Sequence, residues 1–114
     1  MAQFLAIKFT CINQITMAVY YIGSYDIVNR EEFQKYPPKV LALLPKYGGE
    51  VFASDIEAVS LEGKAKTMNA IVKFPSMEAA MNFYNDHEYQ EKIKPIRINS
   101  TKNCTMLLVK QFIP

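Results

Sequence analysis

The sequence predicts one α+β domain in which helices cover a four-stranded antiparallel sheet. Four segments rich in β-branched and aromatic residues are expected to be strands: 17–27, 49–54, 66–74 and 103–112. Two capped, amphipathic segments separate the first strand from the second and the third strand from the fourth. The resulting order, βαββαβ, is that of the ferredoxin-like fold. With 114 residues, of which 50% are hydrophobic, the chain has the length and the apolar content of a single domain.

The first half of the chain is expected to form a strand, a helix and a strand. Strand 17–27, MAVYYIGSYDI, contains no proline. Asn29 is three residues before Glu32, which is the spacing of a helix N-cap and its partner. The prolines at 37 and 38 predict a bend in the helix that follows. The glycine pair 48–49 supplies the left-handed residue that ends a helix.

The second half is expected to form a hairpin, a helix and a final strand. Glu62-Gly63 marks the hairpin turn between the second and third strands. Ser76 is the expected N-cap of a helix over 77–84, and a short second helix is expected over 88–93. The buried face of the first of these helices is expected to comprise Met77, Ala80, Met81 and Tyr84.

Both faces of the predicted sheet are apolar. In the first strand Val19 and Tyr21 alternate with Tyr20 and Ile22, and the last strand alternates in the same way over residues 106–109. Helices from one chain can cover only one face of such a sheet. A second copy is therefore expected to cover the other face, which predicts a homodimer.

Composition excludes several classes of partner and site. The net charge is +2, and the 13 basic and 11 acidic residues are spread along the chain, so no basic stripe is available for nucleic acid. The third strand, KTMNAIVKF, also lacks the aromatic residues of an RNA-recognition motif. His87, Cys11 and Cys104 do not form a metal-ligand pattern, so neither a metal nor another cofactor is expected.

The chain shows no secretory signal and no apolar run long enough to span a membrane, so a cytoplasmic domain with two free thiols and no membrane partner is expected. Met17 opens the first well-patterned strand. This position suggests the hypothesis that residues 1–16 are an N-terminal extension or an over-read start, and that the domain covers 17–114.

Six segments together resemble a bacterial family of unknown function in the dimeric α/β-barrel superfamily. They are MAVYYIGSYDI, KYGGE, LEG, KFPSMEAAMNFYN, EYQEKIKPIR and MLLVKQF, and they span about residues 17–112. The positions that match the family are Tyr47, Gly48, Gly49, Gly63, Phe74, Tyr84, Tyr89 and Arg97. The chain departs from it at Ser24, where an acidic residue is common, and at His87, where a proline is common. A carboxylate role at the end of the first strand would therefore rest on Asp26.

The resemblance implies no single reaction. The superfamily hosts cofactor-free monooxygenases, lactone isomerases, haem-handling enzymes and members that only bind ligands. The resemblance therefore implies a fold and a dimer, and it leaves open whether the protein is an enzyme.

Arg97 is the leading candidate for chemistry. It follows an apolar stretch, and a guanidinium there could hold a carboxylate or an enolate oxygen in a bidentate way. The alternative is a structural role, either an ion pair with Asp26 or a cap on helix carbonyls. His87 is a candidate general base, and the alternative is a solvated residue of the turn NDHE.

The expected function is the binding of a small organic anion in a cavity between sheet and helices, with cofactor-free monooxygenase-like or isomerase-like chemistry. The candidate catalytic residues are Arg97, His87 and Asp26, and the candidate ligand-binding residues are Arg97, Tyr25, Tyr47 and Tyr84. Most of the seven tyrosines are expected to be core or dimer contacts. The alternative function is a non-catalytic dimerisation or ligand-sequestering module.

Overall fold

A computed structural model describes residues 17–114, and the expected extension 1–16, with Cys11, lies outside the described residues. The strands are β1 (Val19–Ile27), β2 (Glu50–Asp55), β3 (Met68–Phe74) and β4 (Thr101–Lys110). The α-helices are α2 (Arg30–Phe33), α3 (Tyr36–Leu43), α4 (Met77–Tyr84) and α5 (Lys94–Ser100). A 3₁₀ turn, η1 (Leu44–Tyr47), extends α3, and a π turn, η2 (Tyr89–Ile93), leads into α5.

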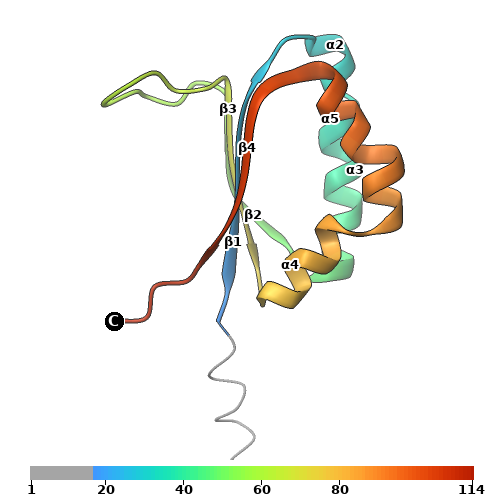
Figure 1. Ribbon diagram of the computed structural model, residues 1–114, viewed down its shortest axis with the longest axis vertical. Helices are drawn as coiled ribbons and strands as arrows, with labels where there is room; N and C mark the ends of the chain where they lie inside the picture. Colours follow the sequence, from blue (N-terminus) through green and yellow to red (C-terminus); the bar gives the residue numbers. More distant parts are fainter. Residues whose placement is uncertain (1–16) are drawn as a thin grey trace, which may run out of the picture.

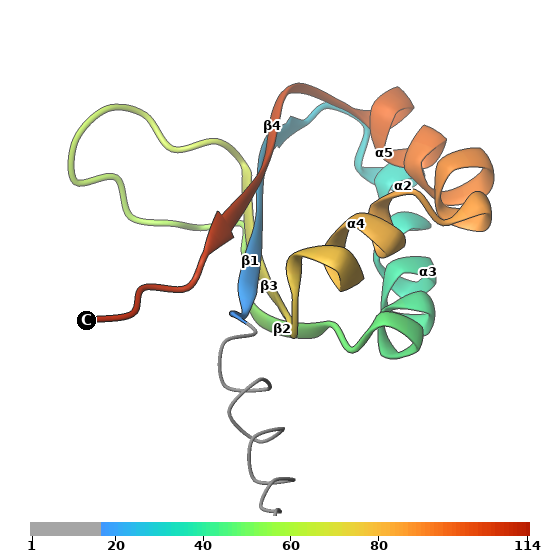
Figure 2. The same ribbon diagram turned by 60° about the horizontal axis from the view of Figure 1, so that its bottom comes forward.

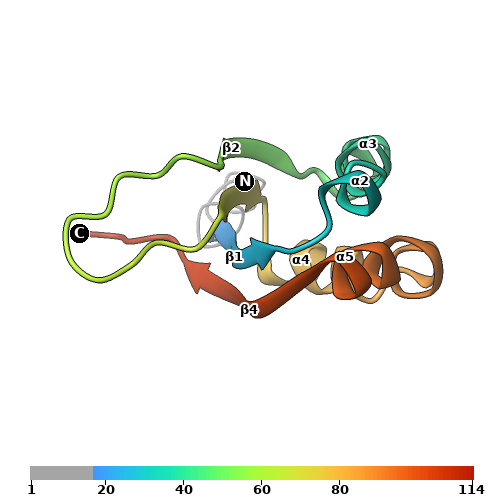
Figure 3. The ribbon, with the colours of Figure 1, turned by 90° about the horizontal axis from the view of Figure 1, so that it is seen from above.

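The four strands form one antiparallel sheet in the order β2-β3-β1-β4. Gly23 lies at the middle of the sheet, where it pairs with Ala70 of β3 on one side and with Met106 of β4 on the other. All the helices lie on one side of this sheet (Figures 1 and 3). The predicted ferredoxin-like α+β fold is therefore confirmed.

The two faces of the sheet have different surroundings. On the helix face, Val19, Tyr21 and Tyr25 of β1 are buried beneath the helices. The opposite face, which we call the open face, carries the alternate residues of each strand, and no helix of residues 17–114 covers it (Figure 1). The loop between β2 and β3 and the C-terminal segment both extend away from the sheet on the open side (Figure 2).

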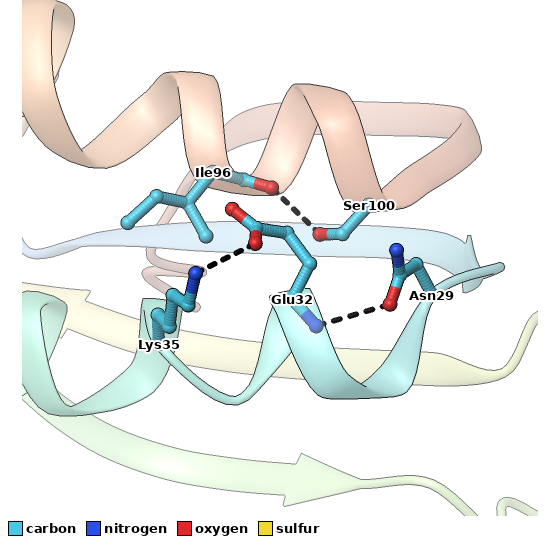
Figure 4. Close-up of polar contacts among 5 residues, drawn as sticks. All are labelled: Asn29, Glu32, Lys35, Ile96 and Ser100. Atoms are coloured by element: carbon cyan, nitrogen blue, oxygen red, sulfur yellow. Dashed lines mark hydrogen bonds and ion pairs between the residues drawn. The ribbon is translucent and has the colours of Figure 1, made fainter.

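Local signals explain the first helical region. The Asn29 side chain accepts a hydrogen bond of 3.0 Å from the backbone N–H of Glu32, and Lys35 pairs with the Glu32 carboxylate at 2.8 Å (Figure 4). The two prolines lie in the first turn of α3, where a missing N–H costs nothing, so the bend falls just before them. The predicted bend is confirmed, and it separates α2 from α3.

Gly48 ends η1 with a φ of 72°, as the glycine pair predicted. Its left-handed backbone turns the chain directly into β2. The predicted hairpin of the second and third strands is also confirmed, because β2 and β3 pair antiparallel across the long loop 56–67.

The expected buried face of α4 was wrong in part. Ala80 and Phe83 are buried, whereas Met77 and Met81 are 36% and 42% exposed. The helix is rotated so that the Phe83 ring packs between the rings of Phe74, at 5.4 Å, and Tyr89, at 4.8 Å. An aromatic ring buries more surface there than a methionine would, which explains the rotation.

The expected end of the helical segment at residue 93 was also wrong. The chain continues as α5 to Ser100, and Pro95 lies in the first turn of that helix, where proline is tolerated. Ser100 ends α5 with its hydroxyl donating to the carbonyl of Ile96 at 2.6 Å (Figure 4). The consequence is that Arg97 lies on a helix that packs over the sheet.

Candidate functional site

Arg97 is buried between α5 and the helix face, with only 2% of its surface exposed. One terminal nitrogen donates to Cys104 Sγ at 3.1 Å, and the guanidinium carbon lies 6.0 Å from the ring centroid of Tyr36. Within residues 17–114, no carboxylate forms an ion pair with Arg97, and its Nε has no hydrogen-bond partner. The expected alternative of an ion pair with Asp26 does not occur in this structure.

A buried guanidinium without a counter-ion is energetically unfavourable. Arginine stays protonated in proteins, so this charge cannot be lost on burial. Burying a charge costs several kcal/mol unless it is paired and hydrogen-bonded, and a thiol and an aromatic ring compensate only part of that cost. The arrangement is therefore complementary to an added anion.

Three buried tyrosines surround the guanidinium. The hydroxyls of Tyr36 and Tyr89 lie 2.7 Å apart and hydrogen-bond each other. The Tyr21 hydroxyl is buried near Tyr89 but makes no hydrogen bond of normal geometry. We call these three tyrosines, Arg97 and Cys104 the Arg97 cluster.

The phenols of the helix face stay neutral at ordinary pH. Burial raises the pKa of Tyr21, Tyr25 and Tyr36 well above that of a free phenol, and the positive charge of Arg97 lowers it by a smaller amount. Each phenol therefore keeps its proton. The Tyr21 hydroxyl can donate that proton in a hydrogen bond to a ligand oxygen.

A β-bulge directs Cys104 toward Arg97. The register of β1 with β4 shifts between Ser24 and Asp26, and Asn103 takes a positive φ of 57° at this point. Asn103 is held there by its side chain, which donates to Asp26 at 3.1 Å, and by its carbonyl, which accepts from Lys66 at 2.7 Å. Bulges of this kind commonly re-aim a side chain.

A π turn places Tyr89 in the cluster. The Asp86 carboxylate accepts from the backbone N–H of Tyr89 at 3.0 Å and from the Tyr47 hydroxyl at 2.5 Å. The second contact ties η2 to η1. The hydrogen bond from Tyr47 is the main cause that lowers the pKa of Asp86, so this carboxylate is charged at neutral pH.

Two apolar hollows flank the cluster. The first, the α3 cavity, has a volume of about 180 Å³ and lies between α3 and the sheet, with walls that include Tyr25, Tyr36 and Ser54. The second, the α4 pocket, has a volume of about 280 Å³ and lies between α4 and strands β1 and β4. Its walls include Tyr21, Met81, Tyr84, Met106 and Leu108.

The four ligand-binding candidates from the sequence do not all meet. Arg97 is the centre of the cluster, Tyr25 lines the α3 cavity, and Tyr84 lines the α4 pocket. Tyr47 lies apart from them because its hydroxyl is bonded to Asp86.

The other two catalytic candidates lie away from the cluster. His87 is exposed, and its Nε2 lies 3.2 Å from the Glu91 carboxylate. Asp26 lies near the C-terminal end of β1, on the open side of the sheet. Its carboxylate accepts hydrogen bonds from the side chain of Asn103 and from the backbone N–H of Thr67. Hydrogen bonds from these two groups lower the pKa of Asp26.

Sequence reasoning had singled out neither Tyr21 nor Tyr36 nor Cys104 for the site. The alternation of β1 could have indicated Tyr21, because it lies on the same face as Tyr25. No local pattern could have indicated the pairing of Tyr36 with Tyr89, which joins residues 53 positions apart.

In the described part of the chain, no group of three or more His, Cys, Asp or Glu side chains is arranged to hold a metal ion. None of the helices in residues 17–114 has the length and hydrophobicity needed to cross a bilayer.

The sequence matches a protein-family model described as "Domain of unknown function (DUF1330)" over residues 18–112. No curated protein matches the chain. Among solved structures it is similar to the methylated RPA0582 protein, with 16% identity and a TM-score of 0.73 over 100% of this chain and 94% of the other. It is also similar to RPA0582 from Rhodopseudomonas palustris, a protein of unknown function, with 15% identity and a TM-score of 0.71 over 94% of each chain. At these identities the likeness supports the fold alone.

Proposed function

Since the chain belongs to the DUF1330 family, a family of domains of unknown function, we propose its function from its own residues: it is a homodimeric domain that binds a small organic anion at the Arg97 cluster. The observation that carries this proposal is the state of Arg97. It is 2% exposed, no carboxylate of the described chain pairs with it, and its Nε–H has no acceptor.

An organic anion would supply what the site lacks. A carboxylate or enolate oxygen could accept from Arg97 Nε, and charge-assisted bonds of this kind are among the strongest hydrogen bonds in proteins. The hollows beside the cluster have largely apolar walls, which suits the hydrocarbon part of such a ligand. An inorganic anion would leave these walls without a partner.

Binding is better supported than catalysis. Cofactor-free monooxygenase-like or isomerase-like chemistry requires a base that takes a proton from the substrate. In residues 17–114, no carboxylate or imidazole hydrogen-bonds a side chain of the cluster, and the two candidate bases, Asp26 and His87, are engaged elsewhere. We therefore propose a ligand-binding or sequestering role first. A hydrogen bond from a neutral phenol to an enolate oxygen is what the cluster could add to such chemistry.

The test uses benzoate and hexanoate as probes, together with native mass spectrometry of the purified protein to detect a co-purifying anion. Arg97→Met keeps most of the side-chain volume and removes the charge. We expect this variant to lose at least about tenfold in affinity for both probes. We also expect its thermal midpoint to rise, because an uncompensated buried charge is replaced by an apolar side chain.

Two outcomes would count against the proposal. If Arg97→Met binds both probes as wild type does, the guanidinium is not the anion site. If the variant is strongly destabilised and the wild-type protein binds neither probe, Arg97 has a structural role. Ile98→Met, on the same helix but 54% exposed, is the control for the introduction of a methionine into α5.

We propose that the open face is the dimer interface. Phe52, Leu107 and Val109 project from it and are 55%, 54% and 42% exposed. Tyr20 packs against Phe52 at 6.0 Å between ring centroids, which continues the apolar surface across the sheet. Two such sheets packed through their open faces would give the arrangement of the dimeric α/β-barrel superfamily that the sequence resembles.

Leu107→Lys tests the interface. A buried lysine at the centre of a dimer would be unpaired, so we expect the variant to sediment as a monomer at micromolar concentration while the wild type sediments as a dimer. The matched control is Ile98→Lys, because Ile98 is equally exposed but lies on the helix side, and this variant should remain a dimer. A monomeric wild-type protein would disprove the interface.

A further inference from the structure

Gly23 and Met106 form a close contact at the centre of the helix face. The two residues are directly paired between β1 and β4. The Met106 side chain lies across Gly23, so that a Cβ atom at position 23 would be 2.8 Å from Met106 Sδ and 3.2 Å from its Cε. The absence of a side chain at Gly23 is therefore what allows Met106 to take this position.

Met106 lies on β4 between the residue that contacts Arg97 and the residues that line the α4 pocket. Two residues before it on the same strand, Cys104 accepts a hydrogen bond from Arg97. Two residues after it, Leu108 pairs with Tyr21, and both of these line the α4 pocket together with Met106. A ligand that extended from the pocket along β4 toward the guanidinium would therefore meet the Met106 side chain.

The methionine is suited to be displaced. Its side chain is unbranched and adaptable, and it is only partly buried. When the Met106 side chain moves, the backbone of Gly23 becomes accessible, and a ligand can pack against it. The rim of the pocket at Met81 is 42% exposed, which provides a route from solvent.

Two buried polar atoms of the Arg97 cluster have no hydrogen-bond partner in the described part of the chain. In residues 17–114, the buried side-chain nitrogen and oxygen atoms without a hydrogen-bond partner are Tyr21 O–H and Arg97 Nε. Both can donate, and both belong to the Arg97 cluster. Leaving a buried donor unsatisfied is unfavourable, and a carboxylate has two oxygens that could accept from these two donors.

We infer that the apolar part of the bound anion occupies the α4 pocket, and that Met106 moves off Gly23 so that the anion's carboxylate can bind Tyr21 and Arg97. This inference rests on the proposed function. The ligand class is a monocarboxylate that carries one ring or a short unbranched chain. The pocket's 280 Å³ allows this size, since a cavity of about 150 Å³ holds benzene.

The α3 cavity is a poorer place for the same ligand. The hydroxyl of Tyr36, which lines it, is already bonded to Tyr89, and neither unpartnered atom of the described chain belongs to a residue of its wall. It is also the smaller of the two hollows. A ligand there would gain apolar contact but no new hydrogen bond to a buried donor.

The experiment is a calorimetric titration of hexanoate, benzoate and acetate against the full chain and four variants. Wild type should bind hexanoate and benzoate more tightly than acetate. Met106→Ala removes the side chain that must be displaced, so affinity for the two larger probes should rise, by about tenfold if the displacement costs 1.4 kcal/mol.

Gly23→Ala provides the converse test. The added methyl group would expel Met106 toward the pocket, and because only the flexible end of a side chain has to move, the variant should fold. Binding of hexanoate should weaken by about tenfold or more and should be restored in the double variant Gly23→Ala/Met106→Ala. Val40→Phe fills the α3 cavity instead and should leave affinity unchanged.

The outcomes separate this inference from the proposed function. If binding depends on Arg97 but is unchanged in both Met106→Ala and Gly23→Ala, the inference is wrong and the proposed function stands. If Val40→Phe abolishes binding, the ligand occupies the α3 cavity and the inference is again wrong. If neither larger probe binds to wild type or to Met106→Ala, both proposals fail together.

Discussion

The helix face and the open face of the same sheet both carry apolar side chains but differ in what covers them. On the helix face Phe74 has no exposed surface, and its ring packs against Phe83 and Tyr21. On the open face Phe52 is 55% exposed, although it also lies beside an aromatic ring, that of Tyr20. The described residues supply a complete core to the helix face only. The difference indicates that the helix face determines whether the chain folds, and it supports our proposal that the open face determines whether chains associate.

The comparison extends to polar groups. Within residues 17–114, the cation on the helix face has no counter-ion. The carboxylate of Asp26, near the open side, instead accepts from three donors of Thr67 and Asn103. Unsatisfied groups in a protein interior are rare and usually have a reason. The helix face is therefore where we expect a ligand, and the open face is where we expect a protein.

The largest expected difference is between the two phenylalanines. In the background of Leu107→Lys, which we expect to be monomeric, Phe74→Ala should lower the free energy of unfolding by about 3–5 kcal/mol, because it leaves a cavity in the core. Phe52→Ala should change it by no more than about 0.5 kcal/mol. Urea unfolding of both variants gives the two values. Similar losses of unfolding free energy in Phe74→Ala and Phe52→Ala would mean that the two faces contribute equally to the stability of the monomer.

The part of the fold that could be predicted from the sequence is the part that local sequence signals determine. Strand alternation and the caps at Asn29 and Ser76 are local, and they predicted the order of the elements and the confirmed fold. The sequence could not predict which face of α4 is buried. Apolar residues recur at helical spacing both on the face that contains Met81 and on the face that contains Phe83. The continuation of the chain into α5 was not predicted, because a proline such as Pro95 commonly marks the end of a helix. Only the structure shows that Pro95 lies in the first turn of a new helix.

The candidate site follows the same rule. Arg97 was chosen as a candidate because it follows an apolar stretch, which is a local signal, and its role as a ligand site stays a prediction. The residues around Arg97 are positioned by the hydrogen bond between Tyr36 and Tyr89 and by the β-bulge at Asn103. No sequence pattern predicts the positive φ of Asn103. The bulge is not visible in the sequence because asparagine occurs in ordinary strands and turns as well.

Alkaline titration should separate the helix face from the rest of the chain. Burial raises the pKa of Tyr21, Tyr25 and Tyr36, and a raised pKa means that the folded state holds the neutral form. The stability that these phenols contribute is complete below the unfolded-state pKa of about 10 and is lost as the pH rises above it. Their tyrosinate absorbance should therefore appear only together with the loss of circular dichroism. Complete ionisation of every tyrosine in a still-folded protein would contradict the buried cluster.

A smaller effect is expected at the carboxylate that positions Tyr89. Asp86→Asn replaces a charged acceptor, bonded to Tyr47 and to the backbone of Tyr89, and should cost about 1.5–3 kcal/mol at neutral pH. Because the pKa of Asp86 is lowered, its contribution is present above the unfolded-state pKa of about 3.9 and is lost as the pH falls below it. The difference between variant and wild type in urea unfolding should therefore shrink in acid.

The control for this prediction is on the other side of the sheet. Asp55 also accepts a backbone hydrogen bond, from Glu57 at 2.7 Å, but it is exposed at the end of β2. Asp55→Asn should change stability by no more than about 0.5 kcal/mol. An equal loss in Asp55→Asn and Asp86→Asn would mean that the charge itself, and not the contacts of Asp86 with Tyr47 and Tyr89, decides the effect.

The smallest expected effect compares two serines whose hydrogen bonds are the same length. Ser76 accepts at 3.0 Å from the backbone N–H of Ala79 at the start of α4, and Ser60 accepts at 3.0 Å from Ala65 within the loop on the open side. Ser76→Ala should cost about 1 kcal/mol, because a helix N-cap satisfies an N–H that α4 cannot satisfy itself. Ser60→Ala should cost less than about 0.5 kcal/mol, because water can replace the hydroxyl in an exposed loop. If Ser60→Ala costs as much as Ser76→Ala, the loop is packed against something in solution. In that case the open face is already covered, and the loop itself is part of the contact with the second copy.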